Sequence, residues 1–239
     1  MARVVQASSA EQLSAEAKSS LPQYSQRSQL ILFFYLLGYN QVSFLGWFWV
    51  LYTTLFRLFS TGFEYERVHE LVWPALVIVQ SGAVIEIINS AFRFVRAPVT
   101  TTFLQVISRL FLVWAVNYMF PDVRSHWSFS TMMVAWSIAE CVRYSYYGFN
   151  LLGSVPRVLT WARYNFFLVL YPLGVGSELL MVYKALPLAY EWNPMYFYFL
   201  IAASLVYLPG FPILFSHMLV QRKKYLKGTY QVAEKKKGQ

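Results

Sequence analysis

Charged residues and cysteine are both scarce in this chain of 239 residues. Only 13% of the residues are charged and 57% are hydrophobic, whereas a soluble domain usually carries about 25% charged residues. So few charges cannot cover a water-facing surface of this size. The single cysteine, Cys141, excludes an intramolecular disulfide and a metal site built from cysteines. Residues 1–28 are polar and lack the short apolar core of a cleavable signal peptide.

Long apolar runs, separated by short polar turns, make up most of the chain. The six runs are Gln29–Phe56, Leu71–Phe92, Val99–Phe120, Trp127–Phe149, Tyr164–Tyr183 and Met195–Leu219. Each run is long enough to cross a hydrocarbon core of about 30 Å, and none shows the short alternating pattern of membrane β-barrel strands. The pattern predicts an all-α polytopic membrane protein, a bundle of six transmembrane helices. Residues 1–28 would be a polar tail, 29–219 the membrane domain and 220–239 a basic tail.

The basic residues predict how the bundle lies in its membrane. The net charge is +9, but the charges gather between the apolar runs and at the tail, which favours a membrane surface over nucleic acid as the partner. Most of the 20 Lys and Arg residues fall on the side that holds both termini. The other side holds Arg57, Arg67, Arg124 and Lys184. The positive-inside rule therefore predicts that both termini are cytosolic.

The last four residues, Lys236-Lys237-Gly238-Gln239, resemble the dilysine retrieval signal of endoplasmic-reticulum membrane proteins. Such a signal is an address that a receptor reads. The alternative interpretation is a polybasic tail attracted to anionic lipid.

Five ionisable residues fall inside the apolar runs: Glu86, Arg109, Glu140, Arg143 and Glu178. Each costs roughly 2.5 kcal/mol or more in a bilayer and is therefore a candidate for function. Glu140 and Arg143 are three residues apart on one helix and are expected to pair locally. Glu86 and Arg109, on neighbouring helices, are candidates for an interhelical pair. Whether these four support catalysis or only hold helices together stays open.

The fifth run combines a phenol with a carboxyl group. Tyr171 and Glu178 are seven residues apart, almost two helical turns, so both project from one face about 10 Å apart along the axis. Gly174 lies between them on that face, and Pro172 is expected to bend the helix. Arg163 sits two turns before Tyr171, towards the cytosol, where it could meet an anionic head group. A phenol and a desolvated carboxylate are typical of acid–base catalysis, which needs no metal.

These residues resemble the signature of a known family. The segments Trp161-Ala162-Arg163-Tyr164-Asn165-Phe166-Phe167, Tyr171-Pro172-Leu173-Gly174-Val175 and Ser177-Glu178-Leu179-Leu180 look like those of the very-long-chain 3-hydroxyacyl-CoA dehydratases, also known as protein tyrosine phosphatase-like proteins. Further stretches that fit are Gln105–Arg109, Glu140–Tyr147, Phe211-Pro212 and His217–Leu219. The resemblance covers roughly Gln29 to Gly228. Asn89 is a departure, because many relatives have histidine there.

The resemblance implies a six-helix enzyme of the endoplasmic-reticulum membrane that acts with other fatty-acid elongation enzymes and uses no cofactor. It would dehydrate a 3-hydroxyacyl-CoA to a trans-2-enoyl-CoA, the third step of fatty-acid elongation. The family's catalytic tyrosine and glutamate fall on Tyr171 and Glu178. Its other motif residues fall on Glu86, Gln105, Arg109, Arg163 and Gly174. We take Glu178 as the base and Tyr171 as the proton donor, although the sequence equally allows the reverse.

Three other functions compete with this interpretation. Cysteine phosphatase activity is disfavoured, because Arg143 follows Cys141 by only two residues, within a predicted helix, and leaves no phosphate-binding loop. A membrane scaffold that binds elongation enzymes without catalysis is the main alternative, and the presence of both Tyr171 and Glu178 argues against it. A transporter would be supported by inverted repeats, and the sequence shows none.

Overall fold

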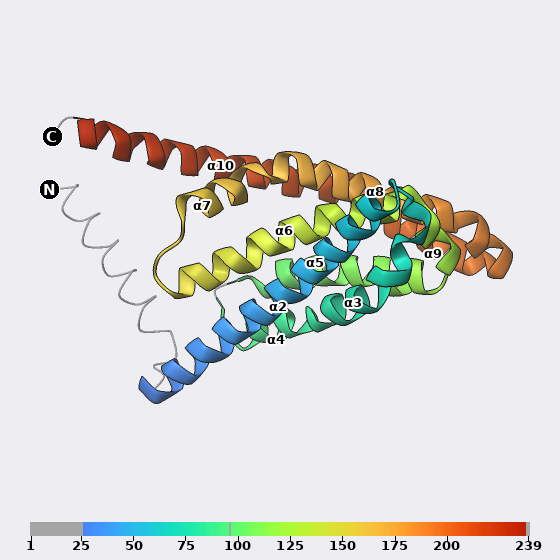
Figure 1. Cartoon of the computed structure of the whole chain (residues 1–239), viewed down its shortest axis with the longest axis horizontal. Coiled ribbons are helices and arrows are strands. Elements are labelled where there is room, and N and C mark those ends of the chain that lie inside the picture. Colours follow the sequence, from blue (N-terminus) through green and yellow to red (C-terminus); the bar gives the residue numbers. More distant parts are fainter. Residues whose placement is uncertain (1–25, 96, 238–239) are drawn as a thin grey trace, which may run out of the picture. The chain divides into compact units, whose positions relative to one another are not determined.

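The computed structural model describes residues 26–95 and 97–237, with the backbone alone at 207–208 and 227–237. Within these ranges the chain is helical and contains no strand (Figure 1). The predicted all-α class is thereby confirmed. Most of the tail 1–28, Arg96 and the end of the proposed retrieval signal lie outside the described residues. The chain divides into residues 1–37 and 38–239, and the packing described below belongs to the second part.

The helices follow the predicted apolar runs closely. In chain order they are α2 (Gln26–Ser60), η1 (Tyr65–Arg67), α3 (Val68–Gly82), α4 (Val84–Ala91), α5 (Val99–Leu110), η2 (Phe111–Tyr118), η3 (Pro121–Ser125), α6 (Trp127–Leu151), α7 (Arg157–Asn165), α8 (Phe167–Trp192), α9 (Pro194–Leu205) and α10 (Tyr207–Lys237). Each predicted run corresponds to one helix or to two consecutive helices. The protein is therefore a multi-pass membrane protein.

Five helical stretches of the described residues are long and apolar enough to cross a membrane. They are Gln26–Ser60, Tyr65–Ala91, Val99–Tyr118, Phe167–Trp192 and Pro194–Leu226. The fourth predicted run, α6, is not among them. It has 25 residues and hence the length of a span, but its serines, Glu140 and Arg143 make it less apolar. Its burial, described next, accounts for this composition.

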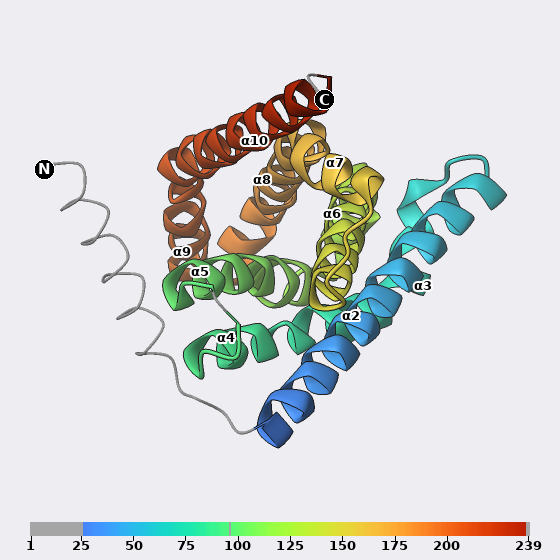
Figure 2. The same ribbon diagram turned by 90° about the vertical axis from the view of Figure 1, so that its left-hand side faces the viewer.

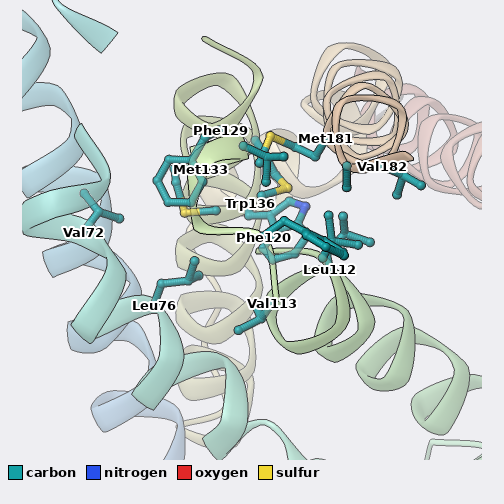
Figure 3. Close-up of a cluster of buried hydrophobic side chains, with 14 of the residues drawn as sticks. Val72, Leu76, Leu112, Val113, Phe120, Phe129, Met133, Trp136, Met181 and Val182 are labelled. Atoms are coloured by element: carbon teal, nitrogen blue, oxygen red, sulfur yellow. The ribbon is translucent and has the colours of Figure 1, made fainter. Parts of the chain in front are cut away.

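The core lies between α6, α8 and their neighbours. Phe129, Met133 and Trp136 of α6 and Met181 of α8 belong to this core, and all four are at most 2% exposed (Figure 3). The helix pair α6 and α8 makes the most extensive contact between elements of the described chain. Figure 2 shows α6 flanked by α5, α7 and α8. A helix surrounded by protein can carry polar residues that a lipid-facing helix cannot.

Three of the spans contain breaks that position side chains. The second span is interrupted at Ala83, between α3 and α4. The third changes from α-helix to π-helix after Leu110, so Arg109 lies at the junction; such π segments are frequent at functional sites. The last span breaks at Val206, three residues before Pro209. Helix α10 then continues beyond residue 219 into the basic tail, as far as Lys237.

Candidate active site

Helix α8 carries the two residues predicted to be catalytic. Glu178 is buried, with 8% of its surface exposed, and Tyr171 is partly buried. The phenol ring of Tyr171 stacks on Phe211 and Phe215 of α10, with centroids 5.1 and 6.0 Å apart. The face thus presents a stacked phenol and, about 10 Å further along the axis, a desolvated carboxyl group.

The Glu178 carboxylate is contacted by a tryptophan of α6. The indole Nε1–H of Trp136 donates a hydrogen bond of 2.8 Å to Glu178 Oε1. Trp136 is 2% exposed, and the guanidinium of Arg109 lies over its ring, 4.9 Å from the ring centroid. The edge of a second tryptophan, Trp47, meets the same ring at 6.4 Å between centroids. The orientation of the Glu178 carboxylate is therefore tied to α6 and, through Trp136, to Arg109.

The other four charged residues of the apolar runs form one connected network. Arg143 donates from Nε to Glu140 at 2.6 Å and from both terminal nitrogens to Glu86, at 2.7 and 2.9 Å. Arg109 donates to the other oxygen of Glu140. The hydroxyl group of Tyr144 donates to Glu86. Two acids and two bases thus neutralise one another inside the bundle.

This network confirms one predicted pair and corrects another. The local pair of Glu140 and Arg143 is present. The interhelical pair suggested for Glu86 and Arg109 is wrong, because Glu86 bonds Arg143 and Arg109 bonds Glu140. The physical reason is that α6 carries one charge of each sign, so Glu86 meets the cation of α6 and Arg109 its anion, although α4 and α5 pack against each other.

Gly174 lies where α8 approaches α6. A Cβ atom placed on Gly174 would lie 3.9 Å from both Ala135 Cβ and Trp136 Cδ1. One turn further, the Ser177 and Thr131 hydroxyl groups are 2.7 Å apart and join the same two helices. The glycine thus gives the backbone of α8 close access to the indole that bonds Glu178.

Arg163 lies on α7, apart from the buried network. Its guanidinium lies over the rings of Tyr146 and Tyr147 of α6, at 4.3 and 5.1 Å from their centroids. The neighbouring Tyr164 stacks on Tyr225 of α10 at 4.5 Å. These aromatic contacts hold α7 against α6 and α10 and fix the position of the Arg163 side chain.

The structure does not bring Gln105 into either cluster. Its side chain is exposed on α5 and has no hydrogen bond to another described residue, while its backbone carbonyl accepts from the Ser108 hydroxyl group at 3.0 Å. Two open cavities of about 440 and 430 Å³ lie elsewhere, around Lys184 and Pro187 at the far end of α8. Neither cavity contains Tyr171 or Glu178.

Trp136, Tyr144 and Phe211 were not singled out as site residues by the sequence analysis. Trp136 is one of eight tryptophans, and no local motif distinguishes it. A signal was available only in its spacing, since Trp136 lies one turn before Glu140 on the same face of α6.

Comparison with known proteins places the chain in a family. The family model described as protein tyrosine phosphatase-like protein, PTPLA, matches residues 80–228. No solved structure matches the chain.

Curated proteins from plants and animals resemble most of the chain. It is 40% identical over 207 residues to the Arabidopsis thaliana protein named very-long-chain (3R)-3-hydroxyacyl-CoA dehydratase PASTICCINO 2, covering 80% of this chain and 92% of the plant protein. It is 38% identical over 208 residues to the Homo sapiens very-long-chain (3R)-3-hydroxyacyl-CoA dehydratase 2, covering 82% of each. The Caenorhabditis elegans protein hpo-8, with the same dehydratase name, is 36% identical, covering 81% of this chain and 95% of the relative. The chain therefore belongs to the protein tyrosine phosphatase-like family, whose members named here are very-long-chain (3R)-3-hydroxyacyl-CoA dehydratases.

Proposed function

We propose that this protein dehydrates very-long-chain 3-hydroxyacyl-CoA to trans-2-enoyl-CoA, by acid–base catalysis between Tyr171 and Glu178. The protein is a hydro-lyase of this dehydratase family. The reaction is the third step of fatty-acid elongation. The observation that carries the mechanism is the placement of a half-buried phenol and a buried carboxylate on one face of α8.

The elimination requires one group that accepts a proton from carbon and a second group that donates a proton to the departing hydroxyl group. Glu178 removes the proton from the α-carbon of the acyl chain, and the electron pair of that C–H bond forms the new double bond. The C–O bond at the β-carbon breaks, and Tyr171 protonates the departing hydroxyl group to give water. The proton then returns from Glu178 to the Tyr171 phenolate before the next turnover.

The surroundings of the two residues support these roles. The Trp136 indole N–H donates to Glu178, and a donor aimed at a carboxyl oxygen favours its ionised form, which is the form a base needs. Tyr171 has no hydrogen bond to another described residue, and a phenol with a reference pKa near 10 is protonated at neutral pH. The phenolic proton is thus available to the substrate.

The remaining motif residues have supporting roles in this proposal. Arg163 binds the phosphates of coenzyme A at the cytosolic end, because a guanidinium pairs well with phosphate. Gly174 has no side chain, which lets Trp136 pack against this face of α8. Glu86 and Arg109 stabilise the helices that surround the site, and Gln105 contacts the substrate.

We place the protein in the endoplasmic-reticulum membrane with both termini cytosolic. Residues 29–219 are the catalytic membrane domain, flanked by tails 1–28 and 220–239. The excess of Lys and Arg near both termini supports this orientation. Other fatty-acid elongation enzymes are its partners, since they supply its substrate and consume its product.

The test is dehydration of a long-chain 3-hydroxyacyl-CoA by the purified protein in detergent. Tyr171→Phe keeps the ring that stacks on Phe211, and Glu178→Gln keeps an oxygen that accepts from Trp136, so both variants should fold like the parent. Each should lower the rate by about 10²- to 10⁴-fold, the usual contribution of general acid–base catalysis. A folded parent that is inactive at every chain length would instead support a scaffold role.

A further inference from the structure

We propose that Trp136 is a positioning residue for the dehydration reaction, through which the buried charge network fixes the orientation and ionisation of Glu178. The inference rests on the proposed function and adds to it a residue outside the signature of α8. Three observations carry it, each from a different contact of the same indole.

The first observation is the hydrogen bond between Trp136 and Glu178. Its length of 2.8 Å is ordinary for an N–H donor, and both partners are buried. Indole N–H can only donate, so this contact always presents a donor to the carboxyl oxygen. It therefore favours the charged carboxylate over the protonated acid and limits rotation of the carboxyl group.

The second observation is that the indole itself is held in place. The guanidinium of Arg109 lies over the ring, 4.9 Å from its centroid. Arg109 is in turn bonded to Glu140, and Glu140 to Arg143. A ring held beneath a guanidinium that is itself ion-paired positions its N–H more precisely than a freely rotating donor would.

The third observation is the close approach at Gly174. A Cβ atom there would lie 4.0 Å from Trp136 Nε1, an ordinary contact distance, so α8 meets the indole nitrogen here without a side chain of its own between them. Gly174 and Glu178 are four residues apart and share a helix face. The α8 signature thus contains both the acceptor of this hydrogen bond and the space through which it is made.

A buried tryptophan commonly finds some acceptor for its N–H. A purely structural role of Trp136 must therefore be distinguished from the positioning role proposed here. A structural role predicts loss of folded protein with unchanged kinetics per folded molecule. The positioning role predicts a lower kcat with little change in KM, and an acid limb of the rate profile that moves to higher pH, because the carboxylate loses a donor that favours its charged form.

The experiment compares Trp136→Phe with Trp47→Phe in the purified full-length chain, using a long-chain 3-hydroxyacyl-CoA as substrate. Both tryptophans are at most 2% exposed and the substitution removes the same volume, but among the described residues Trp47 has no hydrogen bond to Glu178. Trp136→Phe should lower kcat by about ten- to a hundred-fold, the usual value of a hydrogen bond to a charged group. Trp47→Phe should keep the kcat and the pH profile of the parent.

A second replacement separates the N–H from the volume of the ring. Benzothienylalanine at position 136 keeps the bicyclic shape but has sulfur in place of N–H, and it should reproduce the loss of kcat and the shifted acid limb. If Trp136→Phe does not fold, this variant decides the question. Arg109→Lys keeps a charge for Glu140 but loses the planar group over the indole, and its effect should be non-additive with that of Trp136→Phe.

Two results would overturn the inference while leaving the proposed function intact. One is an active parent whose benzothienylalanine variant keeps the parental kcat and pH profile. The other is an equal loss of kcat in Trp47→Phe, which would indicate packing alone. An inactive parent would overturn the proposed function and this inference together.

Discussion

Arg143 and Glu86 are joined by two hydrogen bonds of 2.7 and 2.9 Å, across helices that are separated by more than fifty residues of sequence. This bidentate contact links α4 to α6 inside the apolar bundle. Such a pair is strong because the two N–H groups of a guanidinium match the two oxygens of a carboxylate.

Breaking this contact should destabilise the protein. Arg143→Met leaves Glu86 with hydroxyl partners but no cation, which should cost about 3 kcal/mol because an unpaired buried charge is poorly tolerated. Thermal unfolding in detergent measures the loss. The double variant Glu86→Gln with Arg143→Met should be less destabilised than the sum of the single variants. Strict additivity would contradict the pairing.

Substitutions at Gly174 should be graded by size. Gly174→Ala places its Cβ at ordinary contact distance from Trp136, and alanine favours helix by up to about 1 kcal/mol over glycine, so stability should be retained. Gly174→Val adds methyl groups to a filled interface and should cost about 1–3 kcal/mol. Gly176→Val is the control, because no atom lies within 4 Å of its added Cβ. Equal unfolding temperatures for both valine variants would count against the close contact.

Arg163 should affect substrate affinity more than turnover. Arg163→Gln removes a cation from α7 and leaves α8 unchanged. We expect KM for a long-chain 3-hydroxyacyl-CoA to rise about tenfold and kcat to stay within about twofold of the parent. The reason is that a phosphate contact is equally strong in the ground state and in the transition state. Arg157→Gln, on the same helix and exposed, is the matched control. A fall in kcat with constant KM would argue against phosphate binding at Arg163.

Stability should decrease at low pH through His126, the residue that caps α6. Its Nδ1 accepts from the Ser128 backbone N–H at 3.2 Å, and burial, followed by the charge of Lys184, lowers the pKa of His126. In the unfolded chain, the imidazole of His126 takes up a proton near the reference pKa of about 6.5. In the folded chain its lowered pKa keeps the imidazole neutral to a lower pH. This contribution to stability is therefore complete above about pH 6.5 and is lost as the pH falls below it.

The check is the unfolding temperature of the parent and of His126→Asn between pH 8 and pH 5.5. Asparagine can cap the helix but does not titrate. The parent should lose more stability than the variant over this range. Parallel curves would show that other groups dominate the acid response.

The apolar runs were sufficient to predict the helices, because a run of twenty apolar residues has few alternatives in a bilayer. The local pair of Glu140 and Arg143 was also predictable, since spacing on one helix decides it. The partner of Glu86 was not, because α5 and α6 each offered an arginine and only the packing of the helices selects between them. The break at Val206 lies just before Pro209 and Pro212, as backbone effects of proline extend to preceding residues.

Spacing alone placed Tyr171 and Glu178 on one face of a helix, and the structure agrees with that placement. The contribution of α6 to the site could not be predicted. Trp136 acts across a helix interface, and nothing in its own segment distinguishes it from a tryptophan that only packs. Whether Tyr171 and Glu178 are catalytic stays a prediction that the enzyme assay tests.

The charge network also has a consequence for biosynthesis. Glu86 and Arg109 precede Glu140 and Arg143 in the chain, so the helices that carry them leave the ribosome before α6. Helix α6 is poorly suited to enter lipid alone, but when it emerges an acid and a base that match its own charges are already in the membrane. The order of the charges along the chain therefore allows α6 to insert as a paired helix, and a circular permutation that delivered α6 first should insert inefficiently.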